Sequence, residues 1–125
     1  MSRDYLEAEL VLEIHAVQIA RFGGSPGLRD PGQLDAALHR PQSGYYSDLI
    51  EEAAALWESL SQNHPFIDGN KRTAFASMFV FFGLNGLTLT AGLPDTLQFV
   101  TSLYDTGQFR FEKLEPWLRA NTAPR

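Results

Sequence analysis

Residues 64–72 carry most of the reactive chemistry of this chain and read His-Pro-Phe-Ile-Asp-Gly-Asn-Lys-Arg. They stand where one helical pattern ends and a very apolar one begins. A helix N-terminus presents unpaired backbone N–H groups and a positive dipole end, so Lys71 and Arg72 oppose the local field there. A phosphate group resolves this conflict, because the amides, the dipole and both side chains then point at negative oxygens. The segment therefore predicts a phosphate-handling site.

His64 and Asp68 are the two groups of this segment that suit proton transfer and metal binding. Histidine titrates near neutrality, so His64 can take a proton from a substrate hydroxyl as a general base. Asp68 offers a hard carboxylate oxygen for Mg²⁺, which usually binds through one or two carboxylates plus the phosphates of a substrate. A metal held in this way implies a nucleotide.

The remaining residues of the segment suit phosphate binding. Gly69 lets the backbone approach phosphates closely, and Asn70 is expected to cap the next helix while its amide group reaches an anion or the metal shell. Lys71 and Arg72 can then neutralise the charge that develops on a transferred phosphoryl group. We interpret Phe66 as an anchor that buries its ring and holds the loop against the core.

Each of these residue types also has a purely structural interpretation. A histidine beside a proline is commonly a loop or capping residue, Asp-Gly alone is an ordinary turn, and Lys-Arg alone is an ordinary solvated pair. We favour the functional interpretation because a bound phosphate explains the unusual residues of this segment together. His15 and His39 lack such neighbours, and a structural role is expected for both.

Helices are the elements that must position this segment. Leu6, Leu10, Ile14 and Val17 recur at helical spacing, which predicts an amphipathic helix over about residues 4–22. Capping and breaking signals predict further helices from Asp30-Pro31 to before Pro41, from a Ser47 cap towards His64, over 70–84, over 94–105 and over 111–119. Residues 87–90 are expected to form a short extended stretch.

The helix over 70–84 is expected to be the buried central helix, because its apolar residues lie on every side. Its aromatic cluster is assigned to the core and comprises Phe75, Phe79, Phe81 and Phe82. The predicted fold class is therefore all-α, a single compact domain over residues 1–125 with about six helices.

Composition narrows the function classes. The net charge of -5 argues against a general nucleic-acid binder, which needs a basic face, so no direct nucleic-acid partner is expected. The chain has no cysteine, which fits a reducing compartment. The most apolar run, residues 75–84, is shorter than the roughly 20 residues of a membrane helix. The N-terminus shows no signal-peptide pattern. We expect a cytoplasmic protein with no membrane partner.

The segment from His64 onwards resembles the signature of the Fic/Doc family, whose Fic branch reads H-x-F-x-[D/E]-G-N-G-R-x-x-R. Lys71 stands in place of the last glycine and Phe75 in place of the final arginine. Both departures resemble the Doc branch, the death-on-curing toxins of bacterial toxin–antitoxin pairs. The small size, the helical plan and the Gly/Pro-rich residues 23–32 are also similar to Doc-like proteins.

The resemblance implies a transferase that uses ATP and Mg²⁺, with His64 as base, Asp68 on the metal, and residues 70–72 on phosphates. Fic enzymes generally transfer AMP, whereas Doc is understood to bind the nucleotide reversed and to pass its γ-phosphate to a threonine of elongation factor Tu. The second activity is our expectation, because Lys71 adds bulk beside the phosphates and Phe75 removes one of their clamps. An AMP transferase and a non-catalytic binding module of the same fold are the alternatives.

The resemblance also implies a partner. Many Fic proteins carry a self-inhibitory segment, [S/T]-x-x-x-E-[G/N], and the nearest match here, residues 47–51, is followed by Glu52 and fails at the last position. Inhibition is therefore expected from another chain, an antitoxin whose amphipathic segment folds into an apolar groove. Trp57 and Trp117 are candidate groove residues, with core packing as the alternative interpretation.

Overall fold

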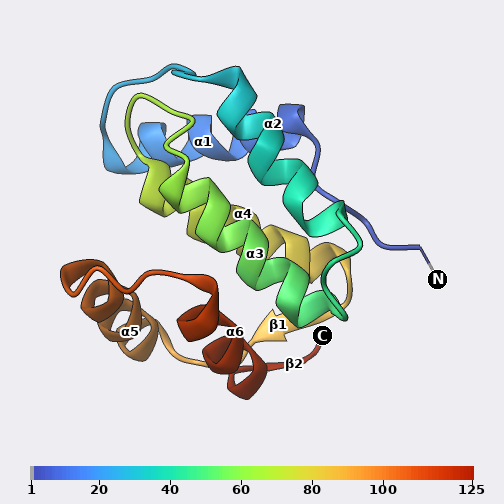
Figure 1. Cartoon of the computed structure of the whole chain (residues 1–125). Helices are drawn as coiled ribbons and strands as arrows, with labels where there is room; N and C mark the ends of the chain where they lie inside the picture. The colour runs from blue at the N-terminus through green and yellow to red at the C-terminus, as the bar shows by residue number, and fades with distance from the viewer. Residues whose placement is uncertain (1) are drawn as a thin grey trace.

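Six α-helices follow one another along residues 2–125, the part of the chain that the computed structural model describes (Figure 1). Their bounds are α1 Ala8–Phe22, α2 Pro31–His39, α3 Leu49–Gln62, α4 Asn70–Leu84, α5 Leu93–Asp105 and α6 Phe111–Ala120. A 3₁₀ segment η1, Arg40–Gln42, follows α2, and two short strands, β1 Leu87–Leu89 and β2 Thr122–Pro124, lie near the C-terminus. The predicted helical class with about six helices is confirmed.

Two helices, α3 and α4, form the middle of the domain and deliver the segment 64–72 between them (Figure 1). α3 packs against α2, α4 and α6, and α1 packs against α4. The prediction that α4 is buried on every side is only partly right. Phe81 and Phe82 are buried and Phe75 packs against the core, but Phe79 is 48% exposed, so its assignment to the core is wrong.

The N-terminus of α3 is capped by Asp48. The Asp48 Oδ1 accepts a hydrogen bond from the Glu51 N–H at 3.0 Å, which satisfies one of the orphan donors of the first turn. Asp48 also pairs with Arg119 of α6 at 2.9 Å. The prediction that Ser47 is the cap is therefore wrong by one residue, because the carboxylate that follows it is the better placed acceptor.

The first helix begins at Ala8 and not near residue 4. Residues 2–7 form no helix or strand, and the main chain of Asp4 exchanges two hydrogen bonds with the side chain of Asn85, both 2.9 Å long. The buried positions of α1 are Val11 and His15. Val17, predicted to belong to the apolar face, is 51% exposed, because the buried stripe follows a different phase of the helix.

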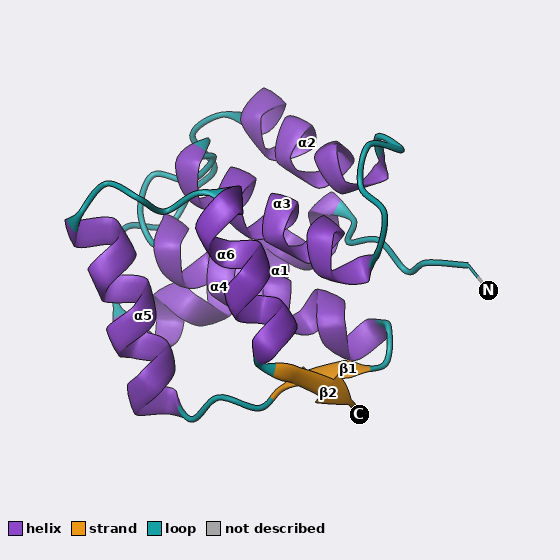
Figure 2. Cartoon of the chain, turned by 60° about the horizontal axis from the view of Figure 1, so that its bottom comes forward, coloured by secondary structure: helices purple, strands orange, loops and turns teal. Residues whose placement is uncertain are grey.

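The extended stretch predicted near residues 87–90 is confirmed as β1 (Figure 2). It pairs antiparallel with β2, with Thr88 opposite Ala123. β2 was not predicted, since Thr-Ala-Pro shows no alternation of apolar and polar residues. The pairing ties the end of α6 to the end of α4.

Trp57 lies at the centre of the core, with 0% of its surface exposed. Its ring meets Phe75 and Phe109 edge-on, at centroid distances of 5.7 and 5.3 Å. Trp57 therefore cannot line a surface groove, and the alternative interpretation, core packing, is confirmed for it. Trp117 is half-buried and stacks on Phe99 of α5 at 4.5 Å. None of the helices within residues 2–125 is long and apolar enough to cross a membrane.

Candidate active site

The loop between α3 and α4 is braced by the Gly/Pro-rich loop between α1 and α2, and the two lie side by side (Figure 1). Leu28 forms an isolated antiparallel bridge with Phe66, and the Ile67 N–H donates to the Gly27 carbonyl at 3.1 Å. The N–H groups of Arg29 and Asp30 both donate to the Pro65 carbonyl. The loop that carries the predicted chemistry is therefore held by main-chain bonds from a segment about 40 residues earlier.

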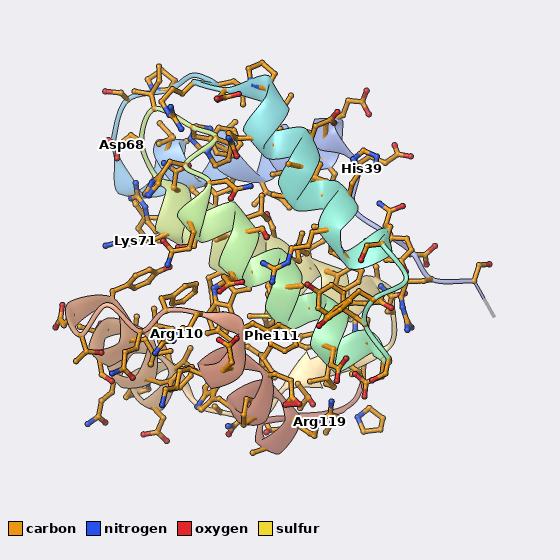
Figure 3. All side chains as sticks on the ribbon, viewed as in Figure 1. His39, Asp68, Lys71, Arg110, Phe111 and Arg119 are labelled. Carbon is orange, nitrogen blue, oxygen red and sulfur yellow. The ribbon has the colours of Figure 1, made fainter. Side chains whose placement is uncertain are left out.

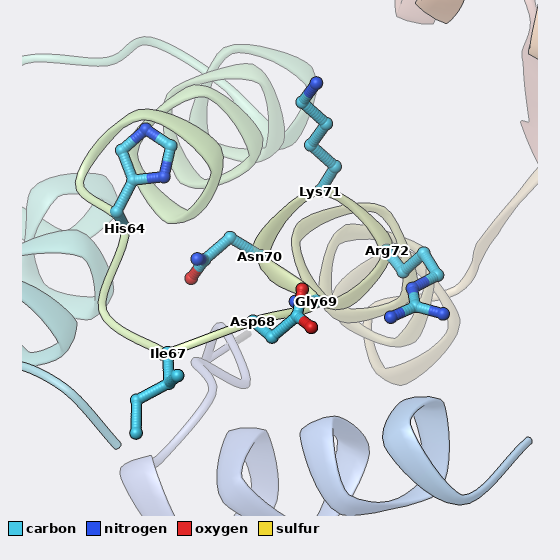
Figure 4. A pocket seen from close by; sticks show the side chains of 7 residues that line it. All are labelled: His64, Ile67, Asp68, Gly69, Asn70, Lys71 and Arg72. Atoms are coloured by element: carbon cyan, nitrogen blue, oxygen red, sulfur yellow. The ribbon is translucent and has the colours of Figure 1, made fainter. Parts of the chain in front are cut away.

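One open pocket of about 400 Å³ collects the predicted site residues at the N-terminal end of α4 (Figure 4). Its lining comprises His64, Ile67, Asp68, Gly69, Asn70, Lys71 and Arg72. The structure thus brings together every residue that the sequence predicted for catalysis, nucleotide binding and metal binding. Phe66 is 1% exposed, which confirms its interpretation as the buried anchor of the loop.

The N-terminus of α4 carries no side-chain cap. Gly69 is the N-cap residue, with φ +74°, a left-handed conformation that glycine adopts without strain. The prediction that Asn70 caps the helix is wrong. Its Oδ1 accepts from the Phe66 N–H at 2.9 Å and its Nδ2 donates to the Phe66 carbonyl at 3.0 Å, so the amide clamps the loop. The backbone N–H groups that open the helix remain available to an anion.

Asp68 presents its carboxylate to the pocket (Figure 4). Its Oδ2 accepts from the Ser25 N–H at 3.1 Å and its Oδ1 from the Gly69 N–H at 2.8 Å. These two hydrogen bonds, first that from Ser25 and then that from Gly69, hold the pKa of the carboxyl group below its usual range. Asp68 is therefore ionised at neutral pH.

The two cations lie on different sides of the pocket (Figure 4). Arg72 donates from Nη2 to the Gly23 carbonyl at 3.0 Å, and its guanidinium lies 5.6 Å from the centre of the Phe22 ring. Lys71 instead places its ammonium 4.4 Å from the centre of the Tyr104 ring of α5. Burial raises the pKa of Tyr104 to about 12, so this ring stays neutral beneath the ammonium.

His64 is exposed at the rim of the pocket and has φ +49°, the one non-glycine residue with positive φ within residues 2–125. Such a conformation is uncommon outside glycine and requires surrounding support. Arg29 supplies that support, since its guanidinium donates to the His64 carbonyl from Nε at 2.8 Å and also from Nη2, and to the Asn63 carbonyl at 3.2 Å. The bonds fix the main chain and leave the imidazole exposed.

The donor set fits a Mg²⁺ ion that is shared with a nucleotide. Asp68 is an exposed carboxylate, and each of its oxygens has a lone pair beyond the one used by a backbone N–H. Residues 2–125 contain no group of three or more histidine, cysteine or acidic side chains that could enclose a metal ion. Mg²⁺ commonly binds through one carboxylate, water and substrate phosphates, and this arrangement matches Asp68.

Sequence reasoning missed the residues that support the pocket from other segments. Ser25 acts through its main-chain N–H, a group that every residue except proline carries, so no sequence signal marks it. Arg29 stands alone in a Gly/Pro-rich stretch and Tyr104 lies in the last turn of α5, and neither belongs to a motif. His15, assigned a structural role, is buried against the loop.

Comparison with known proteins agrees with this geometry. Residues 5–82 match the model of the Fic/DOC family. The chain is 44% identical over 93 residues to Toxin Doc of Mycolicibacterium smegmatis, which covers 70% of this chain and 69% of that protein. It is 34% identical over 87 residues to Protein kinase doc of Escherichia phage P1, which covers 66% of this chain and 69% of that protein. The chain belongs to the Fic/Doc family.

Proposed function

We propose that this protein is a Doc-type toxin that transfers the γ-phosphate of ATP to a threonine hydroxyl of a translation factor such as elongation factor Tu and thereby arrests translation. The observation that carries the proposal is the uncapped N-terminus of α4, which opens into a pocket together with an exposed histidine and an ionised aspartate. The names of two relatives, Toxin Doc and Protein kinase doc, support the toxin and the kinase parts of this proposal.

His64 is the proposed general base of this reaction. The acceptor hydroxyl oxygen attacks the γ-phosphorus, its proton passes to the imidazole, and the bond from that phosphorus to the oxygen of the departing ADP breaks. His64 suits this role because its ring lies exposed at the rim, where a protein substrate can reach it. Positioned general bases typically contribute about 10²–10⁴-fold to a rate.

The opening turn of α4 is the proposed phosphate cradle. The N–H groups of residues 70–72 and the side chains of Lys71 and Arg72 stabilise the negative charge of the transferred group. Asp68 would hold Mg²⁺, whose positive charge neutralises the phosphate oxygens when it is bound. Gly69 forms the turn that opens the cradle, because its φ of +74° suits glycine and a Cβ there would lie 3.1 Å from Ile19 Cδ1 and 3.3 Å from Arg72 Nη2.

Phosphate transfer is favoured over AMP transfer by the surroundings of Phe75. This residue stands where the Fic signature has its final arginine, and its ring packs against Trp57 and Phe79, 5.7 and 6.5 Å away. The pocket therefore has no second arginine clamp from α4 for the α- and β-phosphates. Transfer of AMP is the second candidate, supported by membership of the wider family.

A toxin also requires a partner that silences it, and we infer a cognate antitoxin. The described surface offers an apolar pocket of about 370 Å³ on α1, next to the loop that carries Asp68. Its lining comprises Leu12, His15, Ala16, Ile19, Ala20, Pro26, Gly27, Leu28 and Phe66. Such a surface suits the apolar face of an amphipathic segment. We propose this pocket, in place of the buried Trp57, as the surface that binds the antitoxin.

Labelled ATP tests the proposal directly. We expect purified elongation factor Tu to take up label from γ-labelled ATP when it is incubated with the protein and Mg²⁺. Label from α-labelled ATP on the product would instead establish AMP transfer. His64→Ala is expected to lower the transfer rate about 10²–10⁴-fold while ATP binding persists. His39→Ala, on the exposed end of α2, serves as the control that keeps full activity.

Cell growth decides whether the protein is an enzyme or a binding module. His64→Ala is expected to abolish growth arrest, because the arrest depends on modification of the target. A binding module would arrest growth equally well with histidine or alanine at position 64. Growth arrest by the His64→Ala variant at wild-type strength, without any label on a target, would overturn the catalytic role.

A further inference from the structure

His15 lies beneath the active-site loop, although it comes from the middle of α1. It is buried, with 5% of its surface exposed. Its ring stacks on the ring of Phe66, with centroids 3.8 Å apart and an interplanar angle of 6°. Its Nε2 lies 2.8 Å from the main-chain oxygen of Asp68. The His15 imidazole therefore contacts the loop twice, with its face on Phe66 and with its Nε2 edge on Asp68.

The Asp68 carbonyl determines which nitrogen of His15 carries the hydrogen. A carbonyl oxygen can only accept, so Nε2 of His15 is the donor. A hydrogen bond at one ring nitrogen sets the tautomer of a neutral histidine. The contact therefore has a spectroscopic signature, a proton on Nε2 of the His15 ring.

Three hydrogen bonds hold Asp68, and His15 makes the one to its main-chain carbonyl. Its Oδ2 and Oδ1 are fixed by the N–H groups of Ser25 and Gly69, while its carbonyl is fixed by His15. Only the two side-chain torsions separate this main chain from the carboxylate. A shift of the Asp68 main chain therefore moves the carboxylate within the pocket.

We propose that His15 is a positioning residue that holds Asp68 where its carboxylate can take a Mg²⁺ ion bound to a nucleotide. The inference rests on the proposed function, because it assumes that a metal–nucleotide complex occupies the pocket. His15 acts through Asp68 and takes no part in the phosphate transfer. Groups that orient a metal ligand typically change metal affinity 10–100-fold when they are removed.

Two substitutions separate the donor of His15 from its ring. His15→Gln keeps an N–H donor that can reach the Asp68 carbonyl and loses the stacked ring. His15→Phe keeps an aromatic face against Phe66 and has no donor. His39→Phe is the matched control, because its Nδ1 also lies 2.8 Å from a main-chain oxygen, that of Asp35, but at the far end of α2 from Asp68 (Figure 3).

The test is the Mg²⁺ concentration that gives half-maximal ATP binding by the full chain, measured by calorimetry. We expect His15→Phe to raise this concentration about tenfold. His15→Gln is expected to stay close to the wild type, and His39→Phe to match it. In an Asp68→Asn background, His15→Phe is expected to add nothing, because the two residues act through one ligand.

Long-range ¹H–¹⁵N spectra of the wild-type ring provide a second readout that needs no variant to fold. A proton on Nε2 of His15 supports the inference, and a ring without a proton on Nε2 overturns it. A folded His15→Phe variant with the Mg²⁺ dependence of the wild type would also overturn it. The proposed function fails separately, if the wild type binds ATP with Mg²⁺ yet passes no γ-label to a protein.

Discussion

Asp68 depends on the main chain of its neighbours more than on their side chains. The N–H groups of Ser25 and Gly69 supply the hydrogen bonds that lower the pKa of its carboxyl group. Main-chain donors are fixed by the path of the backbone, so the charge of Asp68 is a property of two adjoining loops. A site built in this way tolerates variation at position 25 and is sensitive to changes in loop conformation.

The charge of Asp68 gives a prediction about pH. We expect the Asp68 carboxyl group to titrate below 3.8, its ordinary value, because both hydrogen bonds favour the ionised form. Since the pKa is lower in the folded state, the stability that these bonds contribute is present above the ordinary pKa and is lost as the pH falls through the lowered value. NMR titration of the side-chain carboxyl carbon measures this, and a midpoint at or above 3.8 would contradict it.

At the scale of elements, the loop between α1 and α2 approaches the site so closely that Gly24 has no room for a side chain. Its φ is +114°, and a Cβ built there would lie 2.8 Å from Asp68 Oδ2. Gly44 provides a matched comparison, since its φ is +82° and a Cβ built there would meet no atom of the described part of the chain within 4 Å. Position 24 therefore combines backbone strain with a clash at the site, whereas position 44 has only the strain.

We expect Gly24→Ala to weaken Mg²⁺-dependent ATP binding by at least about tenfold, because the new methyl group displaces the Asp68 carboxylate. Gly44→Ala is expected to bind as the wild type does. Both variants are expected to lose about 1–2 kcal/mol of stability through the left-handed backbone. Calorimetry and chemical denaturation measure the two effects, and equal binding by both variants would show that the loop does not control the site.

The cap of α3 gives a second prediction at this scale. Asp48→Ala is expected to lower the free energy of unfolding by about 1 kcal/mol, because it removes the acceptor of the Glu51 N–H. Loss of the exposed pair with Arg119 adds at most about 1 kcal/mol. Ser47→Ala is expected to change stability by less than about 0.5 kcal/mol. Urea denaturation of both variants measures this, and a larger loss from Ser47→Ala would restore the sequence-based cap.

The motif was predictable because its chemistry lies within consecutive residues, where the turn alone brings the side chains together. Its supports were not predictable, because they arrive from distant segments. His15 reaches Asp68 across 53 positions and Arg29 reaches His64 across 35, and nothing local records either contact. Asn70 looked like a cap because asparagine favours that position, yet its amide is satisfied by Phe66 of the preceding loop.

At the scale of the whole molecule, helical periodicity predicted the elements but not their mutual packing. Phe79 is exposed and Trp57 is buried because of the way the helices pack against one another. This packing is tertiary structure, which the periodicity of a single helix does not encode. Trp57 of α3 contacts Phe75 of α4, Trp117 of α6 and Phe109 of the loop between α5 and α6. A single ring thus joins the helix that opens at the site to the C-terminal part of the domain.

Trp57 therefore gives the prediction that reports on the whole fold. Trp57→Ala is expected to lower the free energy of unfolding by about 3–5 kcal/mol, as expected for deletion of a buried aromatic ring. Trp57→Phe is expected to cost much less, because the buried indole Nε1–H has no hydrogen-bond partner among residues 2–125 and its removal recovers about 1–3 kcal/mol of desolvation. Urea denaturation followed by circular dichroism measures both. If Trp57→Phe were as unstable as Trp57→Ala, the indole would have a partner in solution, and the core would differ from the packing described above.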